Sequence, residues 1–440
     1  MIEKYYSGVI EQIYNRIGKE TRNIVMANYS NDFSIENLEV IRRYQSNEDN
    51  VFFAYSEFSY NTLVGAYEPF LDIICNMHRR FIGGSFDDFQ KECGVYYLHR
   101  QVLNSYYETG ECFREETVLL NEVAYEQRRM TMAIADMLKK LSEVKPLMIV
   151  INRFQMASKS SIETIKYLID NPCANIGIVL GVNAIVKGTD STVEVWDRIV
   201  ESLEDRSAIY YIGSAGPLKN NVKTTNDDEL YITMNFEQSI QEASNIMEFL
   251  DFEQARRGCR IIEHKLKFED AWIDEKSLRR FYMVYARTSV LLGEMSKAIE
   301  LTNEYKALIP ENDSEHYLSL YYFMKGTCYM YQGKLEKAGN SAKSAYDYAV
   351  LAEDDTLIFK AELLSVMIKM SGWYNIFFCV QDIPVSDEII EKLIKHGYRN
   401  HLAHIYIYAY DNSRDVVKQS FYDESLLKHF TKGLELAKEI

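Results

Sequence analysis

The chain has 440 residues, 47% of them hydrophobic and 26% charged, which is enough for two or three globular domains with cores of their own. Acidic residues outnumber basic ones, 65 against 49, and the formal net charge is -16. An acidic chain repels phosphate backbones and anionic lipid headgroups, so neither nucleic acid nor a membrane is an expected partner.

Four short apolar runs in the first half of the chain predict β-strands. They are residues 23–27, 51–55, 147–151 and 176–180. Helical patterns lie between and around them, over 1–20, 35–44, 117–143 and 160–170 and from Pro69 onward. Wholly apolar strands that alternate with helices indicate a parallel sheet covered on both faces. We therefore predict an α/β domain over residues 1–215, with any ligand site at the carboxyl ends of the strands.

The strand pattern stops before residue 235, and the remaining chain repeats a helical unit. A polar linker at 216–235 precedes a predicted helical repeat domain at 236–440. Three aligned helix pairs carry an alanine at the same place in the motif, at Ala255, Ala298 and Ala338. A regular recurrence of small residues predicts helical hairpins that stack into a solenoid, because one hairpin cannot bury its apolar face alone.

Glycine, alanine and proline punctuate these units in a fixed order. Gly293 and Gly333 occupy the turns between the two helices, and the small residues Ala286 and Gly326 stand seven positions earlier, where two helices cross closely. Pro310 closes the second unit. This order resembles that of tetratricopeptide repeats. The resemblance implies an all-α solenoid that binds a protein or peptide on its concave face.

The segment after the third strand carries a second resemblance. Residues 146–163 read PLMIVINRFQMASKSSIE, an apolar strand followed by a polar turn, a Ser-Ser pair and a helix. This is similar to the Walker B region of STAND-type signalling ATPases, a group that includes LuxR-type and maltose-regulator-like proteins. Residues 55–58 and 66–70 resemble the stretch after the second strand of that family. The resemblance implies a P-loop-like, AAA-like α/β domain that binds ATP and magnesium.

The residues in the phosphate-loop slot, 27–34, depart from what that chemistry needs. A phosphate loop uses glycines for close backbone approach, a lysine for the β- and γ-phosphates and a hydroxyl for magnesium. Here Ala27 and Asp32 stand in place of the glycines and Phe33 in place of the lysine, and only the hydroxyl of Ser34 is kept.

The Walker B positions depart in the same way. Asn152 and Arg153 stand where two acids would hold magnesium and polarise water, and residues 181–184 contain no arginine. Each lost charge-assisted hydrogen bond removes about 1.5–3 kcal/mol, so we expect Mg-ATP to bind roughly a hundred- to ten-thousandfold more weakly than in an active member. No catalytic residue, no metal and no cofactor are therefore predicted.

Other parts of the family pattern are missing too. Only residues 185–235 separate the two predicted domains, with a polar loop at 216–228, and this is too short for the winged-helix segment usual in the group. Residues 420–440 resemble a last repeat helix rather than a DNA-binding effector. The chain either ends without an effector or is a fragment of a longer protein.

Cysteine and histidine give no metal pattern. Seven cysteines are dispersed without a Cys-x-x-Cys pair, which indicates free thiols in a reducing cytoplasm. His401 and His404 share a helix face, and we interpret them as a surface pair rather than as metal ligands. No apolar run is long enough to cross a bilayer, so a cytoplasmic location is expected.

These patterns favour a non-catalytic pseudo-ATPase scaffold for signalling or regulation. Its repeats would bind a protein or peptide in a groove lined by Arg280, Met283, Arg287, Phe323 and Met330. Two alternatives remain open. One is a nucleotide-dependent transcriptional or signalling regulator that still binds ATP or ADP through Arg153 and Ser34. The other is an enzyme of unrecognised type, which no residue constellation supports.

Overall fold

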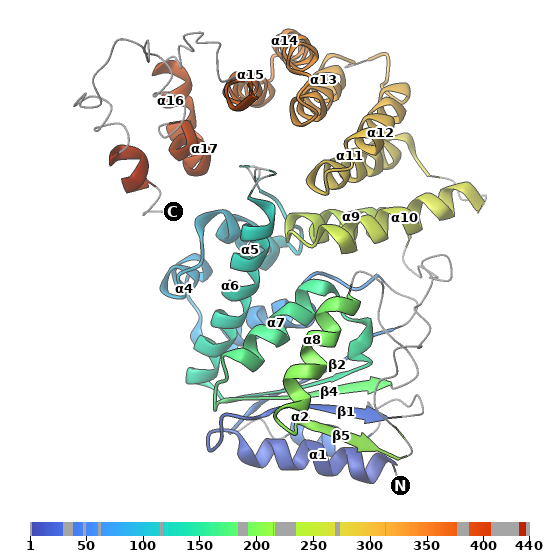
Figure 1. Cartoon of the computed structure of the whole chain (residues 1–440), viewed down its shortest axis with the longest axis vertical. Coiled ribbons are helices and arrows are strands. Elements are labelled where there is room, and N and C mark those ends of the chain that lie inside the picture. Colours follow the sequence, from blue (N-terminus) through green and yellow to red (C-terminus); the bar gives the residue numbers. More distant parts are fainter. Residues whose placement is uncertain are drawn as a thin grey trace. The chain divides into compact units, whose positions relative to one another are not determined.

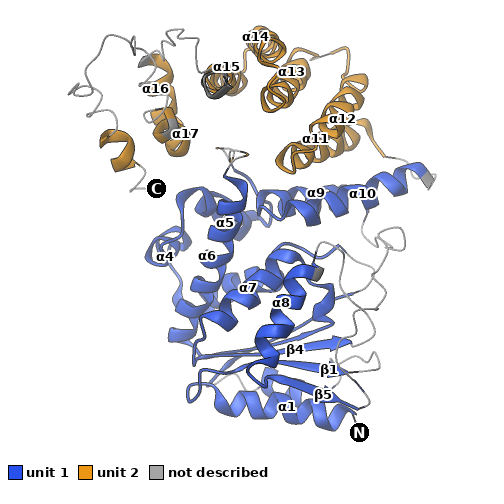
Figure 2. Cartoon of the chain, in the orientation of Figure 1, with its two compact units in different colours: residues 1–114, 121–272 blue, residues 115–120, 273–440 orange. Residues whose placement is uncertain are grey.

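The chain divides into two compact units in the computed structural model (Figure 2). Unit 1 comprises residues 1–114 and 121–272, and unit 2 comprises residues 115–120 and 273–440. The structure describes residues 2–29, 38–46, 50–59, 63–114, 116, 118, 120, 122–183, 192–213, 215, 235–268, 273–312, 314–375, 387–405 and 431–436.

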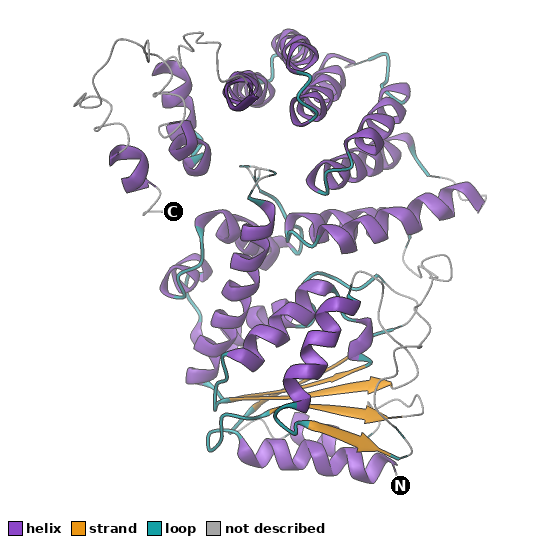
Figure 3. Cartoon of the chain, in the orientation of Figure 1, coloured by secondary structure: helices purple, strands orange, loops and turns teal. Residues whose placement is uncertain are grey.

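Unit 1 is built on one parallel sheet of five strands in the order β2–β3–β4–β1–β5. The strands are coloured orange in Figure 3. The strands are β1 (Ile24–Tyr29), β2 (Phe52–Glu57), β3 (Leu147–Asn152), β4 (Ile176–Asn183) and β5 (Ile209–Ile212). The four strands expected from the apolar runs are present, and the prediction of a parallel sheet is confirmed. The edge strand β5 was not predicted, because its four residues lie in a region interpreted as a spacer.

Helices cover both faces of the sheet (Figure 1). They are α1 (Ile2–Arg16), α2 (Glu39–Gln45), α3 (Phe70–Met77), α4 (Phe86–Glu92), α5 (Tyr97–Thr109), α6 (Val123–Val144), α7 (Lys159–Asp170) and α8 (Val193–Glu204). A π-helical turn, η1 (His78–Ile82), continues α3, and a 3-10 turn, η2 (Phe154–Met156), follows β3. Helices α1 and α2 share a hydrophobic core with one face of the sheet, and α7 and α8 lie over the other face.

Helix α1 lies close to the sheet because β4 carries glycines on that face. Tyr6, Ile10 and Ile13 of α1 are fully buried against the strands. A Cβ placed on Gly177 would come 2.8 Å from Cδ1 of Ile17, and a Cβ on Gly181 would overlap the hydroxyl of Tyr6. Both clashes lie below the closest approach that carbon atoms tolerate in well-packed cores, so this face of β4 has no room for a larger side chain.

A helical hairpin, α9 (Phe236–Glu248) and α10 (Phe252–Phe268), completes unit 1. The sequence placed this hairpin in the repeat domain at 236–440, but the compact units divide between residues 272 and 273. Buried polar bonds fix it: Asp251 accepts the backbone N–H of Ser160 at 2.9 Å, and the side-chain amide of Gln254 donates to the carbonyl of Val64 at 2.9 Å. Asp251 and Gln254, which belong to the aligned repeat motif, thus hold the hairpin against the α/β fold.

Unit 2 consists of further helices, most of them paired. They are α11 (Glu275–Leu291), α12 (Met295–Ala307), α13 (Ser314–Tyr331), α14 (Leu335–Leu351), α15 (Asp355–Asn375), α16 (Asp387–Lys395) and α17 (Arg399–His404). The aligned alanines Ala298 and Ala338 are fully buried. Gly326 faces the carbonyl of Ala338, so α13 and α14 cross closely where the sequence predicted small residues.

One turn geometry recurs between the helices. Gly293 and Gly333 both have positive φ, 77° and 71°, and the residue after each donates its N–H back five residues. Glu353, between α14 and α15, takes the same conformation with φ 54° without being a glycine. The predicted turn glycines therefore end their helices as Schellman-type caps, in which a left-handed residue lets the chain reverse.

Candidate functional site

The sheet topology points to the carboxyl ends of β1 and β4. The chain leaves β1 toward α2 on one face of the sheet and leaves β4 toward α8 on the other. Adjacent parallel strands whose connections depart to opposite faces open a crevice, and open α/β sheets bind ligands there. The residues at these strand ends are thus the first candidates for a site.

The phosphate-loop slot predicted at 27–34 begins inside a strand. Ala27 pairs with Gly181 and Tyr29 pairs with Asn183, so the first three residues of the slot belong to the ladder of β1 and β4. The sequence had ended the strand at Ala27. Asp32, Phe33 and Ser34 lie outside the described residues.

Tyr29 and Asn152 meet at the centre of the site. The Tyr29 hydroxyl donates to Oδ1 of Asn152 at 2.6 Å, and both side chains are fully buried. Side chains alternate along a strand, so Asn152 faces the same side as Met148 and Val150, which lie in the core under α1. Asn152 therefore serves as the polar end of a packed core.

A second tyrosine fills the same space. The ring of Tyr6 packs edge-on against that of Tyr29, with 6.4 Å between the ring centroids. Burial, reinforced by the neighbouring Tyr29, Tyr55 and Glu57, raises the pKa of Tyr6 well above its usual value. Tyr6 therefore stays a neutral phenol, and both rings belong to the hydrophobic core between α1 and the sheet.

Arg153 is held away from β1 by an acid on the edge strand. It has a left-handed backbone, φ 53°, and its Nη1 lies 3.0 Å from Oε1 of Glu57 and 3.4 Å from the carbonyl of Phe58. The Tyr55 hydroxyl donates to the other oxygen of Glu57. The guanidinium is thus committed to an internal carboxylate at the end of β2.

The residues described here do not fit a magnesium–nucleotide complex. Magnesium prefers carboxylate oxygens, and at the Walker B position Asn152 offers a neutral amide oxygen that already accepts the Tyr29 hydroxyl. The neighbouring Arg153 brings a positive charge where a second acid would stand. Asn152 and Arg153, which are consecutive in the sequence, both lie at the end of β3.

Sequence reasoning missed several residues of this candidate site at the strand ends. Tyr6, Tyr29 and Glu57 come from α1, β1 and β2, and Gln155 accepts the backbone N–H of Asn183 at 3.3 Å. Glu57 was detectable as the last residue of a strand in a parallel sheet. The two tyrosines carried no such signal, because their partners are remote in sequence.

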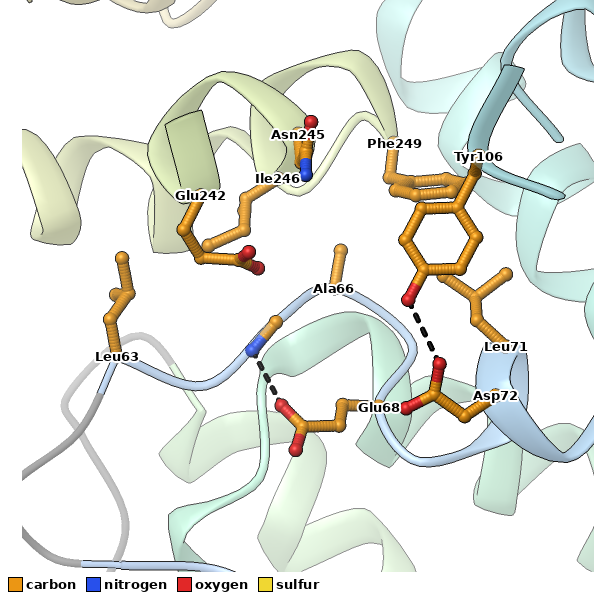
Figure 4. A pocket seen from close by; sticks show the side chains of 11 residues that line it. Leu63, Ala66, Glu68, Leu71, Asp72, Tyr106, Glu242, Asn245, Ile246 and Phe249 are labelled. Carbon is orange, nitrogen blue, oxygen red and sulfur yellow. Dashed lines mark hydrogen bonds between the residues drawn. The ribbon is translucent and has the colours of Figure 1, made fainter. Parts of the chain in front are cut away.

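A second polar place in unit 1 is a cavity of about 270 Å³ between α9, α5 and the segment that leads into α3 (Figure 4). Its lining mixes apolar and polar side chains, and the polar ones include three carboxylates, Glu68, Asp72 and Glu242 (Figure 4). The N–H of Gly65 donates to Glu68 at 2.9 Å, and the hydroxyl of Tyr106 donates to Asp72 at 3.0 Å. No lysine, arginine or histidine is among its lining residues in the described part of unit 1.

Two carboxyl groups of this cavity, those of Glu242 and Glu68, have raised pKa values. Burial, together with the charges of Glu68 and Asp72, raises the pKa of Glu242 to about 7. Burial likewise raises the pKa of Glu68, against the hydrogen bond from Gly65. Glu242 therefore changes its charge near neutral pH. Within the ranges that the structure describes, no group of histidine, cysteine and carboxylate side chains could hold a metal ion.

The residues predicted to line a groove in unit 2 differ in exposure. Arg280 is exposed, and Met283, Arg287 and Phe323 are half-buried on α11 and α13. Met330 is 5% exposed and packs in a core with Ala338, Ala342, Leu364 and Ile368, so it is a packing residue. Phe323 packs against the same core. Arg280, Met283 and Arg287 remain candidates for contact with a partner.

One histidine differs from the sequence interpretation. His401 is 3% exposed and contacts the carboxylate of Glu116, so it is a core residue rather than half of a surface pair. Nothing is described of the His404 side chain. The described cysteines are all free thiols.

Comparisons with known proteins place no relative beside this chain: no family model, no curated protein and no solved structure matches it. Among the helices that the structure describes, none is both long enough and apolar enough to span a bilayer.

Proposed function

We propose that this protein is a non-catalytic pseudo-ATPase scaffold that binds a protein or peptide partner through its helical repeats. In this account the α/β unit keeps the shape of a nucleotide-binding domain as a rigid platform, and the helices of unit 2 supply the contact surface. The fold of the first unit and the helix pairs of the second are observed, and the scaffold role is inferred from them.

The observation that carries the first half is the buried bond between Tyr29 and Asn152, 2.6 Å long. It joins two strand ends that would flank a phosphate and a magnesium ion in an active domain. Breaking it would expose two polar groups that are fully buried, at about 1–3 kcal/mol for each unpaired group. A ligand would have to offset that cost before gaining any contact of its own.

The ion pair between Arg153 and Glu57 argues against the alternative of a nucleotide-dependent regulator. That alternative needs the Arg153 guanidinium to contact a phosphate, but it lies 3.0 Å from a carboxylate. Bringing a phosphate near would place it beside the negative charge of Glu57. Like charges at short range repel strongly in a partly buried site.

The second half rests on how the helices of unit 2 pack. Alanine and glycine fill the crossings at Ala298, Gly326 and Ala338, where the helices approach closely, and Arg280 lies exposed on α11. Stacked helical pairs of this kind present extended surfaces suited to peptides and protein segments.

Affinity capture with the full chain tests the partner-binding role. We expect a defined partner to be retained by the wild-type chain and lost by a charge reversal at the predicted surface, Arg280→Glu with Arg287→Glu. A matched reversal in unit 1, Arg128→Glu, should leave capture unchanged, because Arg128 is exposed on α6. Equal capture by all three chains, or by none, would contradict the proposal.

A further inference from the structure

One side of helix α13 in unit 2 carries tyrosine and lysine in alternation. Tyr321, Lys325 and Tyr329 follow one another at intervals of four residues, so they stand in a row on the same side of the helix. Lys306 of α12 lies beside the first tyrosine of this row, and Lys337 of α14 lies beside the last. We call these five residues the lysine–tyrosine ladder.

Each lysine of the ladder lies over a tyrosine ring. Nζ of Lys306 and Nζ of Lys325 are each 5.1 Å from the ring centroid of Tyr321. Nζ of Lys337 is 5.9 Å from the ring centroid of Tyr329. Lys325 also donates to the Tyr321 hydroxyl at 2.8 Å. Because the face of an aromatic ring attracts an ammonium group, the tyrosines hold three positive charges in a row.

The lysines of the ladder lack the acids that accompany other cations in unit 2. Lys297 and Arg279 also lie over tyrosine rings, and both have a carboxylate partner. Lys297 is 2.9 Å from Glu300, and Arg279 is 3.7 Å from Glu275. Among the residues that the structure describes, no carboxylate forms an ion pair with a lysine of the ladder. The ladder therefore presents positive charge that this part of the chain does not pair.

The charges of the ladder are accessible to a ligand. Lys306 and Lys337 are exposed, and Lys325 is half-buried. Burial works against the charge of Lys325, but its hydrogen bond to Tyr321 and the neighbouring Tyr329 outweigh that effect and raise its pKa. All three lysines thus carry their charge at neutral pH.

We propose that the lysine–tyrosine ladder is a docking surface for an acidic peptide segment of a partner, whose Asp or Glu side chains pair with its three lysines. The segment would supply the carboxylates that Glu300 and Glu275 supply to the other cations over tyrosine rings. This inference goes beyond the proposed scaffold role, because it adds a second contact surface, separate from Arg280 and Arg287, and names the chemistry of its ligand.

The spacing of the charges suits an extended peptide. Lys306 and Lys325 lie at the same distance from one ring centroid, so their ammonium groups are at most about 10 Å apart. Side chains on one face of an extended chain recur about every 7 Å. A segment with an acid at alternate positions therefore reaches neighbouring lysines of the ladder with successive carboxylates.

A single-stranded nucleic acid is the other class of ligand that binds to basic and aromatic residues in alternation. It does so by stacking bases on open ring faces, but Tyr321 is 2% exposed. The net charge of -16 also repels a phosphate backbone. Carboxylates need only the ammonium groups, so the ladder favours an acidic peptide.

The test measures binding of the full chain to a fluorescent peptide of alternating glutamate and serine, about twelve residues long, by fluorescence anisotropy. We expect Lys306→Gln, Lys325→Gln and Lys337→Gln together to weaken binding at least roughly tenfold, because three charge pairs are lost. Raising the salt concentration should weaken wild-type binding as well, since exposed charges are screened. Arginine at the same three positions keeps the charges and should retain binding within about threefold.

A matched control removes the same charge from other lysines of unit 2. Lys276, Lys343 and Lys395 are exposed, and none of them lies over a tyrosine ring in the described part of the chain. Their combined exchange for glutamine should leave peptide affinity within about twofold of wild type. If Lys325→Gln disturbs folding, the two exposed exchanges at Lys306 and Lys337 should still weaken binding about threefold or more.

Equal peptide affinity for the ladder combination and the control combination would overturn the inference, as would a wild-type chain that does not bind the glutamate peptide. Tighter binding of an oligothymidylate of the same length would assign the surface to nucleic acid and overturn it too. The proposed function is tested separately, by partner capture and its loss with the Arg280 and Arg287 reversals, so its failure is distinguishable from the failure of this inference.

Discussion

The two units solve the problem of close packing with opposite residue types. At the strand ends of unit 1, the large side chains of Tyr6 and Tyr29 fill the space, and the Tyr29 hydroxyl donates a hydrogen bond to Asn152. In unit 2, small residues such as Ala338 and Gly326 stand at the crossings, where the helices approach closely. The comparison teaches that large aromatic side chains close the strand ends of unit 1, whereas small residues bring the helices of unit 2 together.

Glycine-to-alanine exchanges should have the largest effect on stability, with opposite signs in the two units. A Cβ at Gly181 would meet the Tyr6 hydroxyl and lie 2.9 Å from Oδ1 of Asn152, so Gly181→Ala should destabilise unit 1 by about 3 kcal/mol. Gly339, exposed in the middle of α14 with no atom near its Cβ position, is the control, and Gly339→Ala should stabilise unit 2 by about 0.5–1 kcal/mol. Denaturant unfolding measures both, and a neutral Gly181→Ala would contradict the packing described for α1.

The internal polar bond can be tested next. Tyr29→Phe removes the hydroxyl that donates to Asn152 and leaves the buried amide oxygen without it, so we expect a loss of about 2 kcal/mol in the free energy of unfolding. Tyr5→Phe, in helix α1, is the control, because Tyr5 is 61% exposed and should tolerate the change. Equal effects of the two changes would mean that the bond contributes nothing.

The acidic cavity predicts a pH dependence confined to unit 1. The pKa of Glu242 is raised to about 7 in the folded protein, above its unfolded value, so the folded state binds the proton more tightly. Stability is therefore highest below the unfolded pKa and falls as pH rises toward 7. Glu242→Gln should reduce this slope, to which Glu68 also contributes, and stabilise unit 1 at pH 8 by about 1–2 kcal/mol, since the partly exposed group is partly screened.

Glu237 provides the matched control for that measurement. It lies exposed in the first turn of the same helix, α9, and Glu237→Gln should leave the pH profile of unfolding as it is in the wild-type chain. A profile of Glu242→Gln that falls between pH 5 and 7 as steeply as that of the wild-type chain would place the titrating group elsewhere.

The smallest expected effect lies in the turns of unit 2. Glu353 and Gly333 flank α14 and both have positive φ, which costs a side chain about 1 kcal/mol relative to glycine. Glu353→Gly should therefore stabilise unit 2 by about 0.5–1 kcal/mol, and Gly333→Ala should destabilise it by a similar amount. Melting temperatures of the two variants should move in opposite directions. A shift in the same direction would refute the shared turn geometry.

The sequence predicted what depends on neighbours along the chain. The four apolar runs became strands, and the turn glycines Gly293 and Gly333 became helix ends, because apolar composition and left-handed backbone are local properties. The short strand β5 was missed, since the four residues Ile209–Ile212 have no flanking pattern that sets them apart from a spacer.

Remote partners set the limit of prediction. The positions of Asn152 and Arg153 at a strand end followed from the sequence, but their partners Tyr29 and Glu57 did not, because side-chain pairing across strands depends on register. In the same way, the motif at Asp251 aligned with the repeats through its local turn, whereas its bond to the α/β fold is visible only in three dimensions.

Calorimetric titration of the full chain with Mg-ATP tests the central claim, that internal contacts already occupy the strand ends of unit 1. We expect no binding heat at micromolar nucleotide, and none after Arg153→Ala. Micromolar affinity that disappears with Asn152→Ala or Arg153→Ala would show that these side chains hold a nucleotide, and it would contradict the account.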